Sequence, residues 1–139
     1  MEIKINTVTT DQDYKDCLYI RNKVFIEEQN INEKLEYDDK KVNAIYIVAK
    51  INLIAIGTAR YRSTEIGMKL ERFAVLKEHR KFGVGSAMVL FLLKKLKNQK
   101  SIYLNSQKDV VNFYKKLGFE IIGEAFYEAG IAHYKMKLA

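Results

Sequence analysis

The chain of 139 residues has no proline, one cysteine and only two histidines. A lone cysteine, Cys17, excludes a disulfide within the chain, and without a Cys/His cluster the sequence gives no sign of a metal site. No apolar run approaches the ~20 residues that a membrane-spanning helix needs. The segment Met1–Ile5 alternates like a strand and lacks the apolar core of a signal peptide. We therefore expect a cytoplasmic protein that does not enter a membrane.

The composition indicates one globular domain, which we place at residues 1–139. Apolar residues make up 48% of the chain and charged residues 29%. The net charge of +7 is spread over the chain, and several lysines stand where helices are expected to end, a position that cations favour for dipole reasons. This pattern favours a solvated surface that steers an anionic small ligand. A nucleic-acid-binding protein ranks last, because no stripe of aromatic and basic residues is grouped.

The apolar periodicity predicts an α/β (α+β) protein with a mixed sheet and helices on both faces. Strands are expected at 2–9, 44–48, 53–61, 68–75, 102–104, 121–122 and 131–136. Helices are expected at 11–28 and 83–97, with a short or irregular connection at 30–37. Ser106–Asp109 is similar to a capping box that opens a further helix, and Gly118 is the glycine expected to end it.

The most informative segment is a strand, Leu70–Val75, followed by a turn that contains Gly83 and Gly85 and opens a helix. Glycines let the backbone approach a ligand closely, and the first N–H groups of a helix attract anions. A phosphate site is therefore expected near the centre of the sheet. The spacing fits neither the P-loop pattern nor the dinucleotide fingerprint, because each needs glycines that this segment lacks.

The pattern Arg80-x-x-Gly83-x-Gly85 resembles the coenzyme A motif of the GCN5-related N-acetyltransferases, the GNAT superfamily. The strand Leu70–Val75 and the later segment Asn112–Phe119 match the other central and C-terminal motifs of that superfamily in order and spacing. Two further segments, 24–29 and 128–133, are similar to a bacterial branch of small, uncharacterised GNAT proteins.

This resemblance implies a GNAT acyl-CoA N-acyltransferase fold with a mostly antiparallel central sheet. It implies transfer of an acetyl group from acetyl-CoA directly to a primary amine of an unidentified acceptor, without a metal. Main-chain groups of the strand would bind the pantetheine arm, and amides of the glycine turn would bind the pyrophosphate, with Arg80 and Lys81 adding charge. The expected donor-site residues are Phe73, Ala74, Val75, Arg80, Lys81, Phe82, Gly83, Val84, Gly85, Ser86, Asn105 and Tyr114.

Two side chains are candidates for proton transfer. The resemblance places Tyr114 where it would donate a proton to the coenzyme A sulfur, although it could also pack with Phe113 and Phe119 in the core. Glu71 could accept the amine proton, directly or through water. It stands two residues before Phe73, so strand alternation predicts that the two side chains share a face. A salt bridge to Arg60, Arg62 or Arg72 is the equal alternative.

The end of the first helix is expected to form part of the acceptor site. Phe25, Glu28 and Gln29 combine aromatic and polar groups suited to an amine, although an exposed helix end would also explain Glu28. His133 could be a base, a substrate contact or a surface residue, and Cys17 is expected in the core. The alternative to an enzyme is a GNAT-like module that senses or carries acyl-CoA without catalysis. The acceptor and the acyl chain length stay open; a homodimer through the C-terminal strand is plausible.

Overall fold

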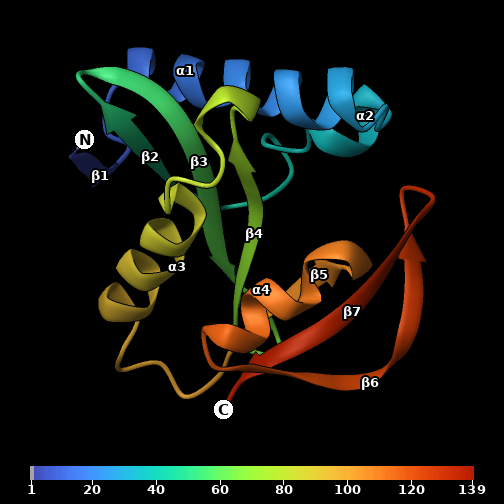
Figure 1. The fold of residues 1–139 in the computed structure, drawn as a ribbon. Helices are drawn as coiled ribbons and strands as arrows, with labels where there is room; N and C mark the ends of the chain where they lie inside the picture. The colour runs from blue at the N-terminus through green and yellow to red at the C-terminus, as the bar shows by residue number, and fades with distance from the viewer. Residues whose placement is uncertain (1) are drawn as a thin grey trace.

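Seven strands form one sheet in the order β1-β2-β3-β4-β5-β7-β6 in the computed structural model, which describes residues 2–139 (Figure 1). The strands are β1 (Ile3–Thr7), β2 (Ile45–Ile51), β3 (Ile54–Ser63), β4 (Met68–Val75), β5 (Ile102–Gln107), β6 (Phe119–Glu128) and β7 (Ile131–Leu138). All neighbouring strands run antiparallel except β4 and β5. The predicted mixed, mostly antiparallel sheet is confirmed.

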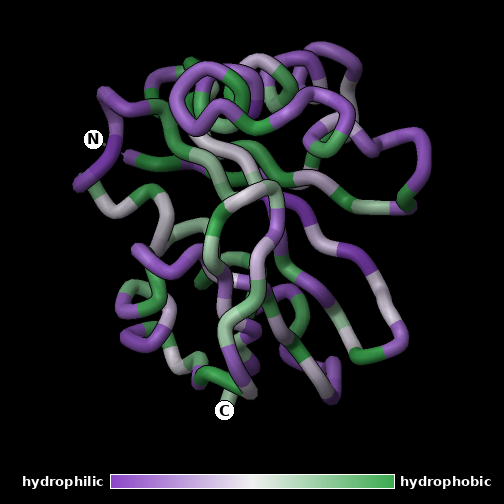
Figure 2. The backbone as a smooth tube through the Cα atoms, turned by 90° about the vertical axis from the view of Figure 1, so that its right-hand side faces the viewer, coloured by the Kyte–Doolittle hydropathy of each residue, from purple (hydrophilic) through white to green (hydrophobic). Residues whose placement is uncertain are grey.

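Helices cover both faces of this sheet, as the sequence predicts. The α-helices are α1 (Asp11–Arg21), α2 (Glu33–Glu36), α3 (Val84–Lys95) and α4 (Val111–Lys116). α1 packs on one face over β2, β3 and β4, whereas α3 packs on the other face over β1 to β4. Figure 2 shows hydrophobic residues concentrated along the central strands and hydrophilic ones on the peripheral turns. Most of the apolar core lies on the α3 side, where Met88 and Leu92 are completely buried.

Several local predictions are confirmed and others need correction. The Thr10 hydroxyl caps α1 by accepting from the Asp13 N–H at 3.1 Å, as expected. The helix then changes at Asn22 to a π-helical stretch, η1 (Asn22–Glu28). The capping box predicted at Ser106–Asp109 is wrong. Ser106 belongs to β5 and its hydroxyl donates to the Gln107 carbonyl, so the following helix begins without a side-chain cap.

A bulge in β4 changes which side chains share a face. Thr58 pairs with Ala74 and Arg60 with Glu71, so β4 carries one residue more than β3 at this point. Arg72 sits in the bulge with a φ of +58°. Phe73 consequently packs with the α3-side core, while Glu71 contacts Arg60 on the α1 side. The prediction that Glu71 and Phe73 share a face is wrong, because the extra residue interrupts the strand alternation.

Candidate active site

The cleft of the protein opens where β4 and β5 separate. In these parallel strands only Met68–Leu70 of β4 pairs with Ile102–Leu104 of β5, and beyond that point no ladder joins the two strands. A cleft of about 800 Å³ lies in the gap, lined by β4 from Lys69 to Val75 and by Asn105 and Gln107 of β5. The main chain of β4 therefore has one side free of strand partners, which is the arrangement an extended ligand needs to pair with a strand.

The glycine turn and the start of α3 form one end of the cleft. Gly83 has a φ of +80°, a left-handed conformation that favours glycine, and it is the residue that precedes α3. The first intrahelical bond there is donated by the Ala87 N–H to the Gly83 carbonyl at 2.9 Å. The N–H groups of Val84, Gly85 and Ser86 have no intrahelical acceptor and line the cleft. This end of the cleft therefore suits an anion.

Phe113 lies so close to the turn that it limits the size of the side chain at position 85. A Cβ atom on Gly85 would come within 3.3 Å of the Phe113 ring, which also lines the cleft. The neighbouring Lys81 lines the cleft with a φ of +72°, and Phe82 is exposed. Asn105 lies on the opposite wall. Its Oδ1 atom is buried and has no hydrogen-bond partner among residues 2–139, so it is free to bind a ligand donor.

Arg80 bridges the turn to the end of η1. Its Nη atoms donate to the two Glu28 carboxylate oxygens at 2.6 and 2.9 Å, and its Nε donates to the Val75 carbonyl at 2.9 Å. The sequence predicts that Arg80 adds positive charge for a phosphate. Glu28 neutralises that charge in this structure, and Arg80 instead ties the turn to β4 and to the helical segment expected to border the acceptor.

Tyr114 packs in the aromatic core and also borders the cleft, so both locations that the sequence suggested for it are present. Its ring packs edge-on against Phe73, Phe113 and Phe119, with centroids 5.0 to 6.1 Å apart. It also lines the cleft. Burial raises the pKa of Tyr114 above its ordinary value, so the hydroxyl is uncharged at neutral pH.

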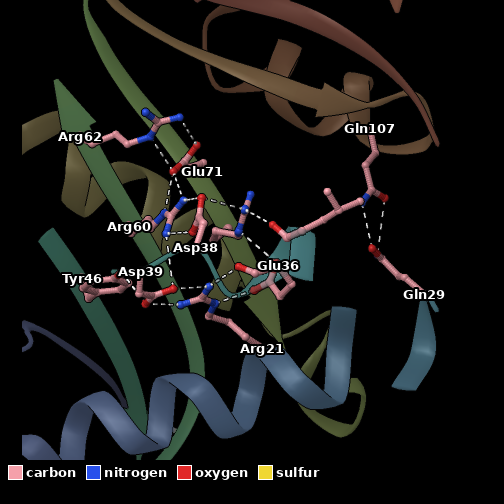
Figure 3. Close-up of polar contacts among 12 residues, drawn as sticks. Arg21, Gln29, Glu36, Asp38, Asp39, Tyr46, Arg60, Arg62, Glu71 and Gln107 are labelled. Carbon is pink, nitrogen blue, oxygen red and sulfur yellow. Dashed lines mark hydrogen bonds and ion pairs between the residues drawn. The ribbon is translucent and has the colours of Figure 1, made fainter. Parts of the chain in front are cut away.

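Glu71 lies among cations on the α1 side of β4 (Figure 3). Its carboxylate accepts from Arg60 at 2.6 Å and from Arg62 at 2.9 Å, and lies 3.1 Å from the Lys69 ammonium. Burial alone would raise its pKa, but the Arg62 hydrogen bond and the charges of Arg60 and Lys69 lower the pKa to about 2. The salt-bridge alternative is thus present, and a carboxylate held in this way is a weak base.

The ion pairs continue from Glu71 into a buried network that the sequence interpretation missed. Arg60, itself fully buried, pairs with Asp38 at 2.8 Å. Arg21 of α1, equally buried, pairs with Glu36 at 2.6 Å and with Asp39 at 2.9 Å. The Nε of Arg72 lies 3.0 Å from the Glu36 carboxylate. No motif marks these residues, because the partners lie 15 or more residues apart and meet only through the fold.

The remaining predicted acceptor residues lie at the cleft from two directions. Phe25 and Gln29 of the η1 region line one wall, and Gln29 exchanges hydrogen bonds with Gln107 of β5, the shorter at 2.9 Å (Figure 3). His133 of β7 lines the facing wall. Its Nδ1 lies 2.7 Å from the Ile131 carbonyl and must therefore donate, which leaves Nε2 with a lone pair when the ring is neutral. Glu28 does not join them, since it pairs with Arg80.

Three further structural observations concern residues outside the cleft or the chain as a whole. Cys17 is completely buried, as predicted, and burial raises the pKa of its thiol to about 11. Across residues 2–139, no helix has the length and apolar character needed to cross a membrane. The same part of the chain holds no group of three or more His, Cys, Asp or Glu side chains placed to bind a metal ion.

Known proteins share this sequence pattern and this fold. A model of the acetyltransferase (GNAT) domain matches residues 9–139. The uncharacterised N-acetyltransferase YjcF of Bacillus subtilis is 36% identical over 129 residues, which cover 91% of this chain and 92% of that protein.

Solved structures agree with the family match at the level of the fold. Escherichia coli ElaA has a TM-score of 0.85 at 22% identity, with 99% of this chain and 100% of that chain covered. A GNAT family acetyltransferase from Elizabethkingia anophelis, solved with acetyl-CoA bound, has a TM-score of 0.72 at 18% identity, with coverage of 98% and 97%. Together with the matched domain and the divided sheet, these similarities show that the chain belongs to the GNAT acetyltransferase family.

Proposed function

We propose that the protein transfers an acetyl group from acetyl-CoA to a primary amine. The observation that carries this proposal is the separation of β4 from β5 beside the α3 N-terminus, with Tyr114 on the same wall of the cleft. The pantetheine arm would pair with the free side of β4 at Phe73, Ala74 and Val75. The pyrophosphate would accept from the N–H groups that begin α3, and the buried Asn105 oxygen would accept from an amide of the arm.

The chemistry follows from which groups hold protons. The amine nitrogen attacks the thioester carbonyl carbon, the carbon–sulfur bond breaks, and the sulfur leaves as a thiolate. Tyr114 donates its proton to that sulfur, since a tyrosine hydroxyl carries its proton at neutral pH. An N–H of the free β4 edge can hold the developing oxyanion. The amine must also lose a proton, which requires a base.

His133 fits the base better than Glu71 does. The Nδ1–H of His133 is fixed on a carbonyl, so its Nε2 can accept a proton in the neutral ring. Glu71 already accepts from two arginines, and its pKa is about 2. We therefore assign Glu71 the task of holding Arg62 and Lys69 in the cleft wall. If Glu71 acted as a base, directly or through water, Glu71→Gln would lose most of its kcat with every amine, whereas loss of a residue that only positions Arg62 and Lys69 would mainly raise KM.

The test of the transfer reaction is release of coenzyme A with a panel of amines. Wild-type protein should release coenzyme A with at least one amine, and Tyr114→Phe should lower kcat about 100-fold, because the leaving thiolate loses its acid. Binding of acetyl-CoA, followed by calorimetry, should stay nearly unchanged. Tyr61→Phe is the matched control, since Tyr61 is buried in the same core away from the cleft.

Two results would argue against this function. An unchanged kcat in Tyr114→Phe would remove that hydroxyl from the reaction. Tight binding of acetyl-CoA without turnover of any amine would instead support the sensor or carrier alternative.

A further inference from the structure

The charge network on the α1 side of the cleft contains more cations than carboxylates. Its four carboxylates are Glu36, Asp38, Asp39 and Glu71, and its five cations are Arg21, Arg60, Arg62, Lys69 and Arg72. One positive charge is therefore left over. A partly buried charge without a counter-ion is costly, which makes the position of the surplus informative.

The surplus lies at Arg62 and Lys69. Arg21 has Asp39 and Glu36, and Arg72 has Glu36 and Asp38. Arg60 has Asp38 as a second partner at 2.8 Å. Arg62 and Lys69, which face each other across the β3–β4 ladder, have only Glu71, and they share it with Arg60.

Both of these side chains have free donors that border the cleft. Arg62 uses Nε and Nη2 on Glu71, and its Nη1 makes no hydrogen bond to any residue in 2–139. Lys69 is 13% exposed and has one carboxylate oxygen within 4 Å in the same described chain, so two of its three protons are available. Arg62 is 28% exposed, and both residues line the cleft. Glu128 lines the cleft too but forms no ion pair with either residue.

We propose that the acceptor carries an acid group, a carboxylate or a phosphate, in addition to its amine, and that Arg62 and Lys69 bind this group. The inference rests on the transfer reaction proposed above. The free Nη1 of Arg62 and the Lys69 ammonium can donate to the oxygens of either acid, and the added anion would balance the surplus charge. In this proposal Glu71 contacts Arg62 and Lys69 and holds them in position, and it does not itself bind the acceptor.

The first test compares amines that differ only in the acid group. The pairs are 4-aminobutyrate with butylamine, and 2-aminoethyl phosphate with ethanolamine. For the wild type, kcat/KM should be at least about tenfold higher for the acid member, because the free energy of one hydrogen bond to a charged group corresponds to about this ratio. The two pairs show whether carboxylate or phosphate is preferred. The double variant Arg62→Gln/Lys69→Met should bring both ratios close to one.

The control variant is Lys97→Met, which removes one exposed lysine outside the network and should leave the ratios unchanged. A general loss of stability lowers kcat/KM for both amines of a pair by the same factor, so the ratio of the two values reports on binding of the acid group. Equal kcat/KM values for acid and neutral amines in the wild type would overturn the proposal.

A second test needs no turnover. In the presence of coenzyme A, 4-acetamidobutyrate and N-butylacetamide are titrated into the wild type and the double variant by calorimetry. The acid should bind about tenfold tighter to the wild type only. Equal affinities would refute the acid-binding site. Tighter binding of the acid without turnover of any amine would leave that site standing and refute the transfer reaction.

Discussion

At the scale of single residues, Tyr114 packs in the core and also carries the acid role that we propose. Its ring faces Phe73, Phe113 and Phe119, and the same residue lines the cleft. The aromatic contacts fix the position of the ring, and a tyrosine hydroxyl carries its proton at neutral pH. Core packing and the proposed acid role are therefore compatible, because the core contacts would hold the acid in a fixed position.

Glu71 shows the opposite effect of surroundings on a titratable group. Its carboxylate would be a plausible base in isolation, but Arg60, Arg62 and Lys69 stabilise its charged form. Because the folded-state pKa lies below the ordinary value of 4.5, its ionisation stabilises the fold above pH 4.5. That contribution is lost as the pH falls from 4.5 towards 2.

Glu71→Gln tests this assignment through stability. At pH 7 the variant should lose roughly 3 kcal/mol of unfolding free energy, as the pKa difference implies. At pH 3.5 the difference between wild type and variant should be smaller by about 1 kcal/mol, since the unfolded carboxyl is then mostly protonated. Urea unfolding at both pH values measures this. Glu120→Gln, an exposed carboxylate of β6, is the control, and a pH-independent difference for Glu71 would contradict the assignment.

At the scale of elements, the bulge in β4 separates two tasks. Leu70 and Phe73 face the α3-side core, whereas Glu71 and Ala74 face the α1 side. Without the extra residue at Arg72, alternation would place Glu71 and Phe73 together. The bulge therefore allows one strand to present the aromatic group near Tyr114 on one face and the charged network on the other.

The network around Arg21 ties α1 to α2 and to the segment between α2 and β2. Arg21 donates to the Glu36 carboxylate, the Glu36 carbonyl and the Asp39 carboxylate at 2.6 to 2.9 Å. Tyr14 and Tyr46 donate to the same Asp39 carboxylate. Regular secondary structure is short in this segment, so these hydrogen bonds hold it beside the cleft.

Arg21→Met should accordingly destabilise the protein by about 3–5 kcal/mol, because it leaves the buried Glu36 and the half-buried Asp39 carboxylates without their main cation. Lys23→Met, which breaks a surface ion pair with Glu27 at 3.3 Å, should have a much smaller effect. Urea unfolding of both variants at pH 7 gives the comparison. Equal losses would show that the Arg21 network does not stabilise this segment.

The sequence predicted those elements that have local signals. The periodicity marked α1 and α3, Thr10 marked the start of a helix, and the glycine turn marked the start of α3 at one end of the cleft. Ser106 gave a misleading signal, because strand pairing with Tyr134 outweighs its local capping preference. The bulge at Arg72 and the Arg21 pairs had no signal, since both depend on contacts between distant segments.

At the scale of the whole molecule, the division of the sheet creates the site. β1 to β4 form one part and β5, β7 and β6 the other, joined only by the short β4–β5 ladder. The glycine turn and Tyr114 border the cleft together with the charged wall of Arg62, Lys69 and Glu71. The proposed function therefore requires that acetyl-CoA bind at the turn that opens α3.

The most direct test of that claim uses two glycines with the same backbone strain. Gly83 and Gly123 have φ values of +80° and +77°, and a Cβ at either would meet no atom within 4 Å. Of these two glycines, Gly83 lines the cleft and Gly123 does not. We predict that Gly83→Leu and Gly123→Leu lower Tm to a similar extent, while calorimetry shows at least a tenfold loss of acetyl-CoA affinity, ~1.4 kcal/mol, for Gly83→Leu alone. Wild-type affinity in the Gly83→Leu protein would contradict the account.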